Sequence, residues 1–241
     1  MEEYAEIMQA CYEATCNVQN INYEFLKEKY DSEIIGESSI GEKAKDLLRK
    51  LMDKIEEFFH KVLDAMKRTL TRVVLIIDKT KGNIMNTFAN KKKGTKDLQV
   101  PNYSSYYVQR WATDQINFVF NNIKKVNTEN GEKVIYNPPF KNEEDKQMVD
   151  TKPSDEIDEL RGYKNNIKAI ENCRKYIRDI YRYETSRRTE ETEGKAVLNL
   201  AFQISQTAVK LINKRVNAAC TVLLRAFRKS NSIGIKYKKL F

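Results

Sequence analysis

Apolar side chains recur every three or four positions over residues 39–78, and this spacing predicts a long amphipathic helix. Residues that favour helices are dense there and proline is absent. Ser39 and Glu42 have the spacing of a capping box, in which a hydroxyl and a carboxylate satisfy free amides at a helix start. The run over 72–78 (RVVLIID) would suit a short strand or a continued helix, and we favour the helix. The apolar stripe consists of Ala44, Leu47, Leu48, Leu51, Ile55, Phe58, Phe59, Val62, Met66, Leu70 and Val73.

The same periodicity predicts four further helices, and turn-forming residues predict the breaks between them. The predicted helices cover residues 2–31, 102–126, 155–184 and 195–229. Residues 32–39 are expected to form a break, and residues 79–100 a loop or frayed end. The stretch 127–155 contains Asn130-Gly131, Pro138-Pro139 and Pro153, which predicts a linker or small hairpin.

Only 8 glycines and 4 prolines occur in 241 residues, so few tight turns are available. The expected fold class is therefore mainly α: an elongated helical bundle of four or five long helices with one irregular linker rich in proline, glycine and acidic residues. The expected organisation is a helical leader at 1–37, an amphipathic helical region at 38–126, the linker at 127–155, and a C-terminal helical hairpin with a basic tail at 156–241.

Charge is unevenly distributed along the chain, whose formal net charge is +9. Residues 1–37 hold nine acidic and two basic side chains, so this leader carries −7 and the remainder +16. Residues 195–241 hold ten lysines and arginines and no acidic residue. Such asymmetry bears on partners rather than on fold, and it favours polyphosphate, an anionic membrane surface, or the acidic leader of the same chain.

The basic C-terminal region is the leading candidate for binding an anion. Lysine and arginine supply phosphate contacts, and interleaved aromatic residues supply stacking faces. No helix-turn-helix, zinc-finger or RNA-recognition pattern is present, so binding to double-stranded DNA would be directed to the backbone and unspecific. The candidate contact residues are Lys210, Lys214, Arg215, Arg225, Arg228, Lys229, Lys236, Lys238 and Lys239.

An anionic membrane is the rival partner. The helix predicted over 39–78 combines Phe58 and Phe59 with a lysine-rich face, as an interfacial helix does. A helix that packs in a globular core shows the same pattern. The longest unbroken apolar run, Val73 to Ile77, is far shorter than a membrane span, and the acidic N-terminus does not resemble a signal peptide.

Motifs for catalysis, metals or cofactors are not found. His60 is the only histidine, and the four cysteines (Cys11, Cys16, Cys173 and Cys220) contain no CxxC pair, so we interpret them as small core residues in a reducing compartment. Phosphate-binding glycine loops and a nucleophile elbow are absent. Carboxylates at 56–57 and at 155–159 could pair for acid–base chemistry, but their helical spacing favours a solvated face. We therefore expect no enzymatic activity, no cofactor and no small-molecule substrate.

The acidic N-terminal helix followed by ESSIGEKAKDLLRKLMDKIEEFFHKVLDAMKR (37–68) resembles minor structural and internal virion proteins of tailed bacteriophages of Gram-positive hosts. The resemblance covers roughly residues 1–95 and lies in the order and style of the segments. It implies a virion location, in the capsid interior or tail, with other virion proteins, copies of itself and DNA as partners. Without that resemblance, the expected location is the cytoplasm.

The resemblance also suggests a candidate cleavage site at Ile35-Gly36-Glu37, a short pattern at which some phage head proteases cut. The site falls where the acidic leader meets the basic remainder, although Ile40-Gly41-Glu42 fits the pattern equally well. The hypothesis is that residues 1–37 mask the basic region or are removed from it.

These observations lead to three functional expectations. The first is a non-enzymatic helical structural or internal virion protein that packs against other virion proteins and DNA. The alternative is a membrane-associated protein with an amphipathic helix, and the third is an unspecific nucleic-acid-binding module. Steeply salt-dependent DNA binding would separate the first and third from the second.

Overall fold

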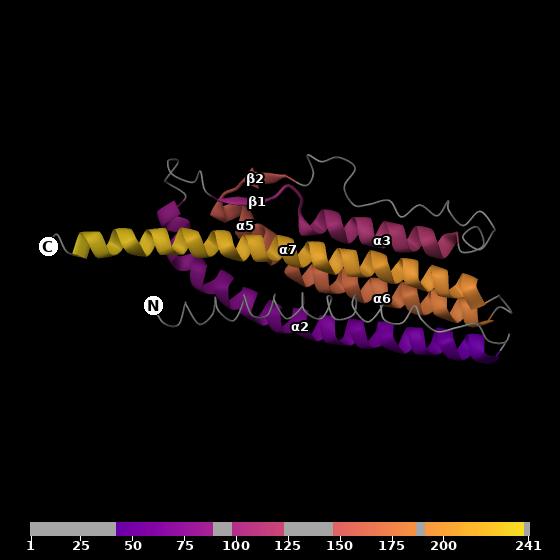
Figure 1. Ribbon diagram of the computed structural model, residues 1–241. Helices are drawn as coiled ribbons and strands as arrows, with labels where there is room; N and C mark the ends of the chain where they lie inside the picture. The colour runs from indigo at the N-terminus through magenta and orange to yellow at the C-terminus, as the bar shows by residue number, and fades with distance from the viewer. Residues whose placement is uncertain (1–41, 89–97, 123–146, 187–190, 239–241) are drawn as a thin grey trace.

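Five helices and one pair of short strands make up the described part of the computed structural model, which covers residues 42–88, 98–122, 147–186 and 191–238. The fold is mainly α and elongated, as the sequence predicts (Figure 1). In chain order the elements are α2 (Glu42–Phe88), β1 (Gln99–Pro101), α3 (Ser105–Asn121), β2 (Met148–Asp150), α5 (Pro153–Arg161), α6 (Tyr163–Ser186) and α7 (Glu191–Lys238).

Helices α6 and α7 form the centre of the bundle, and each packs against both α2 and α3. Helices α2 and α7 begin at the same end of the molecule, where Figure 1 shows the indigo and orange ends side by side. A Cβ on Gly194, near the start of α7, would lie 3.3 Å from Leu48 Cδ1 near the start of α2. The small residue at 194 therefore allows the two helix starts to approach closely.

One hydrophobic core runs through the bundle and takes residues from all five helices. Phe58 on α2 is fully buried and packs edge-to-face against Phe202 on α7, with ring centroids 5.0 Å apart. Ala201, Ala208 and Ala219 on α7 are also fully buried, as expected for small residues where helices approach. The regions 38–126 and 156–241 thus contribute to the same core.

Helix α2 extends further than its apolar stripe indicated. The segment 72–78 is helical, as predicted, but residues 79–88 are helical too, and the expected loop at 79–100 is wrong for that part. The sequence 79–88 contains no proline, and a single glycine at 82 costs only about 1 kcal/mol relative to alanine, so nothing in it ends the helix. The loop was predicted from the polar composition of the segment, and polar composition by itself does not exclude an exposed helix.

The predicted helix 155–184 consists of two helices, α5 and α6, that meet at Gly162. Pro153 occupies the first turn of α5, where the missing amide hydrogen of proline has no helical partner to lose. Apolar spacing continues through the junction, so periodicity did not reveal it. Helix α7 extends beyond the predicted 195–229 at both ends, and α3 is shorter than the predicted 102–126.

A short antiparallel ribbon packs against α7 and was not predicted. Val100 of β1 pairs with Val149 of β2, and Leu98 and Val100 bury Val222 of α7. The strand β2 falls in the predicted linker 127–155, but its partner comes from residues 99–101 rather than from within the linker. The predicted leader 1–37 and its helix 2–31, and most of the linker, lie outside the described residues.

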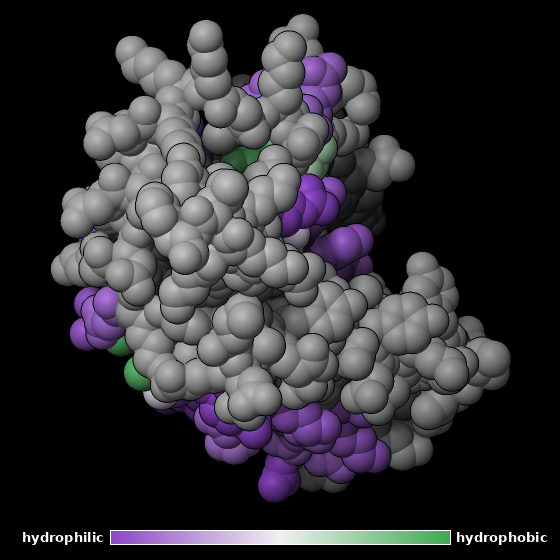
Figure 2. Space-filling view, turned by 90° about the vertical axis from the view of Figure 1, so that its left-hand side faces the viewer, coloured by the Kyte–Doolittle hydropathy of each residue, from purple (hydrophilic) through white to green (hydrophobic). Residues whose placement is uncertain are grey.

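Hydrophilic side chains gather along the lower edge of the bundle when it is viewed end-on in Figure 2, on the side where α2 runs in Figure 1. Helix α2 carries exposed lysines and acidic residues close together, Lys61 and Glu57 among them. Its outer face is therefore of mixed sign.

Candidate functional site

The outer face of α7 carries exposed basic side chains without acidic ones. Lys210, Lys214 and Arg225 are exposed, and they follow one another at steps of 4 and 11 residues. Because an α-helix has 3.6 residues per turn, both steps return to nearly the same side. No acidic residue occurs in α7 after Glu193, so charge pairs three or four residues apart cannot form along this face.

Five of the remaining predicted contact residues cannot be placed with their side chains. Helix α7 continues through positions 228, 229, 236 and 238, so these four residues belong to the same helix, but their side chains lie outside what the structure describes. Lys239 and the candidate cleavage residues Ile35, Gly36 and Glu37 lie outside the described residues altogether.

Arg215 does not belong to the exposed face, and this corrects the sequence prediction. Only 8% of its side chain is exposed, and its guanidinium is paired with Glu156 of α5. Nη2 lies 3.0 Å from Glu156 Oε1, Nη1 donates to Oε2, and Nε donates to the Tyr103 carbonyl oxygen at 2.9 Å. A guanidinium held by these acceptors is not available to an external anion.

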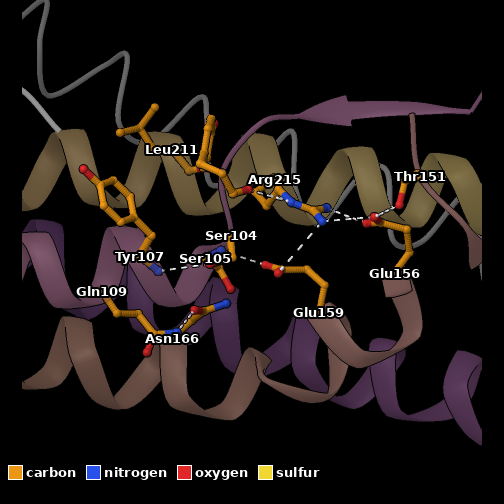
Figure 3. Close-up of polar contacts among 11 residues, drawn as sticks. Ser104, Ser105, Tyr107, Gln109, Thr151, Glu156, Glu159, Asn166, Leu211 and Arg215 are labelled. Carbon is orange, nitrogen blue, oxygen red and sulfur yellow. Dashed lines mark hydrogen bonds and ion pairs between the residues drawn. The ribbon is translucent and has the colours of Figure 1, made fainter. Parts of the chain in front are cut away.

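Arg215 lies in a buried network that joins α7, α5, the start of α3 and the end of β2 (Figure 3). Thr151 donates its hydroxyl to Glu156 Oε1 at 2.6 Å. Glu159 accepts from the backbone amide of Ser105 at 2.8 Å, and its other carboxylate oxygen lies 3.9 Å from Arg215 Nη2. One cation and two carboxylates therefore share a site from which water is largely excluded.

The start of α3 offsets the surplus negative charge of this network. Ser105 is the first residue of α3, where free amides and the helix dipole favour an anion such as the Glu159 carboxylate. Ser104 caps the same helix by accepting from the Tyr107 amide at 3.2 Å. The arrangement fixes where α3 begins relative to α5, and this is a structural role.

Tyr103 completes the contact between the ribbon and α7. Its hydroxyl donates to the Leu211 carbonyl oxygen at 3.3 Å. Burial raises the pKa of Tyr103 to about 12, with Arg215 lowering it and Glu159 raising it. The phenol is therefore a neutral hydrogen-bond donor at neutral pH.

Of the carboxylates considered for acid–base chemistry, Glu56, Glu156 and Glu159 are buried or partly buried and paired, contrary to the predicted solvated face, whereas those at 57, 155 and 158 are exposed as predicted. Glu156 is fully buried, and Glu56 of α2 accepts from Arg174 Nε at 2.7 Å and Arg178 Nη2 at 2.8 Å on α6. Burial by itself would raise the Glu56 pKa, but the hydrogen bonds and charges of Arg178 and Arg174 outweigh burial and lower it. A second bridge, Lys67 to Glu171 at 3.4 Å, joins the same two helices.

One feature of the sequence could have indicated that Arg215 is buried. Arg215 is seven residues from both Ala208 and Val222, which are buried on α7, and this step of seven returns to the same side of the helix. A basic residue within an apolar stripe requires a buried partner. Its acidic partners could not be named, because they come from a helix about 60 residues earlier in the chain.

In the part of the chain that the structure describes, the remaining candidate residues are not grouped in a way that would support catalysis or metal binding. His60 is exposed on α2, with Nε2 3.5 Å from Asp64 of the same helix. Within the described ranges, no group of three histidine, cysteine or acidic side chains could hold a metal ion. Cys173 and Cys220 are buried and not joined in a disulfide, as the core interpretation predicts, whereas Cys11 and Cys16 lie outside the described residues.

Among the described helices, none is both long and apolar enough to cross a membrane. No protein-family model matches the chain, and neither a curated protein nor a solved structure matches it.

Proposed function

We propose that the protein is a non-enzymatic structural protein that holds a polyanion against the outer face of α7 while its other helices pack against protein partners. DNA inside a virion is the polyanion that the sequence resemblance implies. The observation that carries the proposal is the pair Lys210 and Lys214, both exposed on a helix that has no acidic residue beyond Glu193.

The contrast with the other helices supports this choice of face. On α2 and α6 some basic side chains lie beside carboxylates, for example Lys67 beside Glu171. Around Lys210 and Lys214, no carboxylate of the described residues lies within 4.0 Å. A charged row without counter-charges is attractive to phosphates because binding there does not first require breaking an ion pair.

Backbone-directed binding agrees with the long straight course of α7 in Figure 1. A row of lysines along one helix can contact successive phosphates without entering a groove, so it provides affinity but no sequence selection. The described helices offer many exposed positions for protein partners, including the large apolar side chains Val74 and Leu75 of α2, which are 45% and 46% exposed.

Duplex DNA binding measured over a range of salt concentrations tests this proposal. The full chain is compared with Lys210→Gln/Lys214→Gln and with a matched control, Lys164→Gln/Lys168→Gln, which removes two exposed lysines from α6. For the α7 variant we expect the slope of log affinity against log salt to fall by about 2 and the low-salt affinity to fall roughly tenfold or more, because each phosphate contact contributes about 0.9 to the slope. The control is expected to change little.

Two outcomes would contradict the proposal. Equal losses in the two variants would mean that net charge, rather than this face, determines binding. Absence of salt-dependent DNA binding, together with co-sedimentation with vesicles of anionic lipid, would favour the membrane-associated alternative. Binding to anionic vesicles is therefore measured with the same three proteins.

A further inference from the structure

The basic face defined by Lys210, Lys214 and Arg225 of α7 has a source of opposite charge within the same chain. Residues 1–37 carry −7, and the following residues 38–41 are uncharged. This leader lies outside the described residues, and it joins the bundle at Glu42, where α2 begins. Charge complementarity therefore identifies it as a candidate occupant of the basic face.

The geometry of the bundle brings the attachment point of the leader close enough to that face. Leu48 of α2 lies beside Gly194 of α7, so the leader is attached at the end of the molecule where α7 starts. Lys210 is 16 residues further along α7, a distance of roughly 24 Å at 1.5 Å per residue. A segment of 37 residues spans more than twice this distance even as a continuous helix, and more when extended.

We propose that residues 1–37 dock on the basic face of α7 and compete there with an external polyanion. Docking depends only on charges of the chain itself, whereas the competition rests on the proposed function. Exposed ion pairs contribute only about 0–1 kcal/mol each and are screened beyond about 10 Å at 0.1 M salt. The leader is covalently linked to the bundle, and such a link can give an effective concentration on the order of millimolar.

These magnitudes explain why a leader docked in this way can be displaced. A duplex with many phosphates replaces several weak pairs at once and releases counterions, so it outcompetes the leader when its concentration is sufficient. The docked leader is expected to lower the affinity of the basic face for polyanions at low concentration and to be displaced by DNA at high concentration.

Cross-linking of the full chain tests docking without DNA. A zero-length carboxyl-to-amine reagent is applied at low salt, and linked peptides are identified by mass spectrometry. We expect links from carboxylates of residues 1–37 to Lys210 and Lys214, and their loss at high salt. Lys164 and Lys168, exposed on α6, are the internal comparison. If links to α7 are no more frequent than links to α6, docking on the basic face is refuted.

Charge removal in the full chain tests the competition. The variant Glu2→Gln/Glu3→Gln/Glu6→Gln removes three leader charges, and the matched control Asp46→Asn/Asp53→Asn/Glu57→Gln removes three from the exposed side of α2. We expect the leader variant to bind duplex DNA more tightly than the control at low salt, although both have the same net charge. Equal affinities overturn the competition.

The two experiments distinguish failure of leader docking from failure of the proposed DNA binding, on which the competition rests. Failure of DNA binding in every variant would remove the proposed function and the competition, while the cross-links would still decide whether the leader docks. DNA binding by the leader variant but not by the parent would support the mask directly.

Discussion

Arg215 of α7 and Glu156 of α5 form a buried ion pair, in which the guanidinium is 8% exposed and the carboxylate side chain 1% exposed. The pair connects α7 to the nine-residue helix α5, which also buries Ile157 and Leu160 in the core. With the bonds from Arg215 to the Tyr103 carbonyl and from Ser105 to Glu159, it links α5 and the start of α3 to the middle of α7.

Replacing Glu156 with glutamine is expected to destabilise the fold by about 3 kcal/mol, because the change leaves the buried Arg215 guanidinium without its main counter-charge. Glu159, 3.9 Å away, compensates only in part. Urea unfolding at neutral pH measures the loss. The matched control is Asp155→Asn on the exposed side of α5, which is expected to stay within about 0.5 kcal/mol of the parent.

The double variant Arg215→Met/Glu156→Gln provides a further check on the same pair. Removing both charges avoids an uncompensated buried ion, so the double variant should lose less stability than the sum of the two single changes. A loss equal to the sum would show that the two side chains do not interact in the folded protein.

Glu56 is expected to make stability depend on pH in the acidic range. Its pKa in the folded protein is lowered by Arg178 and Arg174 below the ordinary value of 4.5, so the folded state binds fewer protons than the unfolded state. The stabilisation is fully present above pH 4.5 and is lost as the pH falls through the lowered value. Glu56→Gln should therefore cost on the order of 1–2 kcal/mol at neutral pH and progressively less under acidic conditions.

Thermal unfolding of the parent and of Glu56→Gln, measured from neutral to acidic pH, shows whether the difference in stability between the two proteins shrinks as the pH falls. Glu57→Gln is the control, since Glu57 is more than half exposed and pairs with Lys61 on its own helix. A constant difference between the parent and Glu56→Gln at every pH would argue that the lost interaction is not the carboxylate charge.

Cys173 is expected to resist thiol reagents in the folded protein. Burial raises its pKa to about 12, so almost no thiolate is present near pH 8, and the side chain is inaccessible to a reagent. Labelling followed by peptide mass spectrometry should modify Cys173 only as fast as the bundle unfolds, and rapidly in denaturant. Rapid modification under native conditions would show that α6 separates from α7 locally.

The helical nature of the chain followed from the sequence because it depends on local spacing. The stripe that includes Leu48, Ile55 and Phe58 repeats at the helical period without proline, and any packing partner would leave that pattern helical. The acid-free region after residue 195 is likewise a property of the sequence, and two of its lysines, Lys210 and Lys214, are exposed in the structure.

Only the tertiary structure decided which charges are available and where the helices are interrupted. Arg215 and Lys214 are adjacent and equivalent by composition, yet one is buried and the other exposed, because α5 presents Glu156 to just one side of α7. The pairing of residues 99–101 with 148–150 depends on contacts some 50 residues apart. Local periodicity carries no information about such distant partners. These partners decide which charged side chains are buried in ion pairs and which remain exposed on the surface.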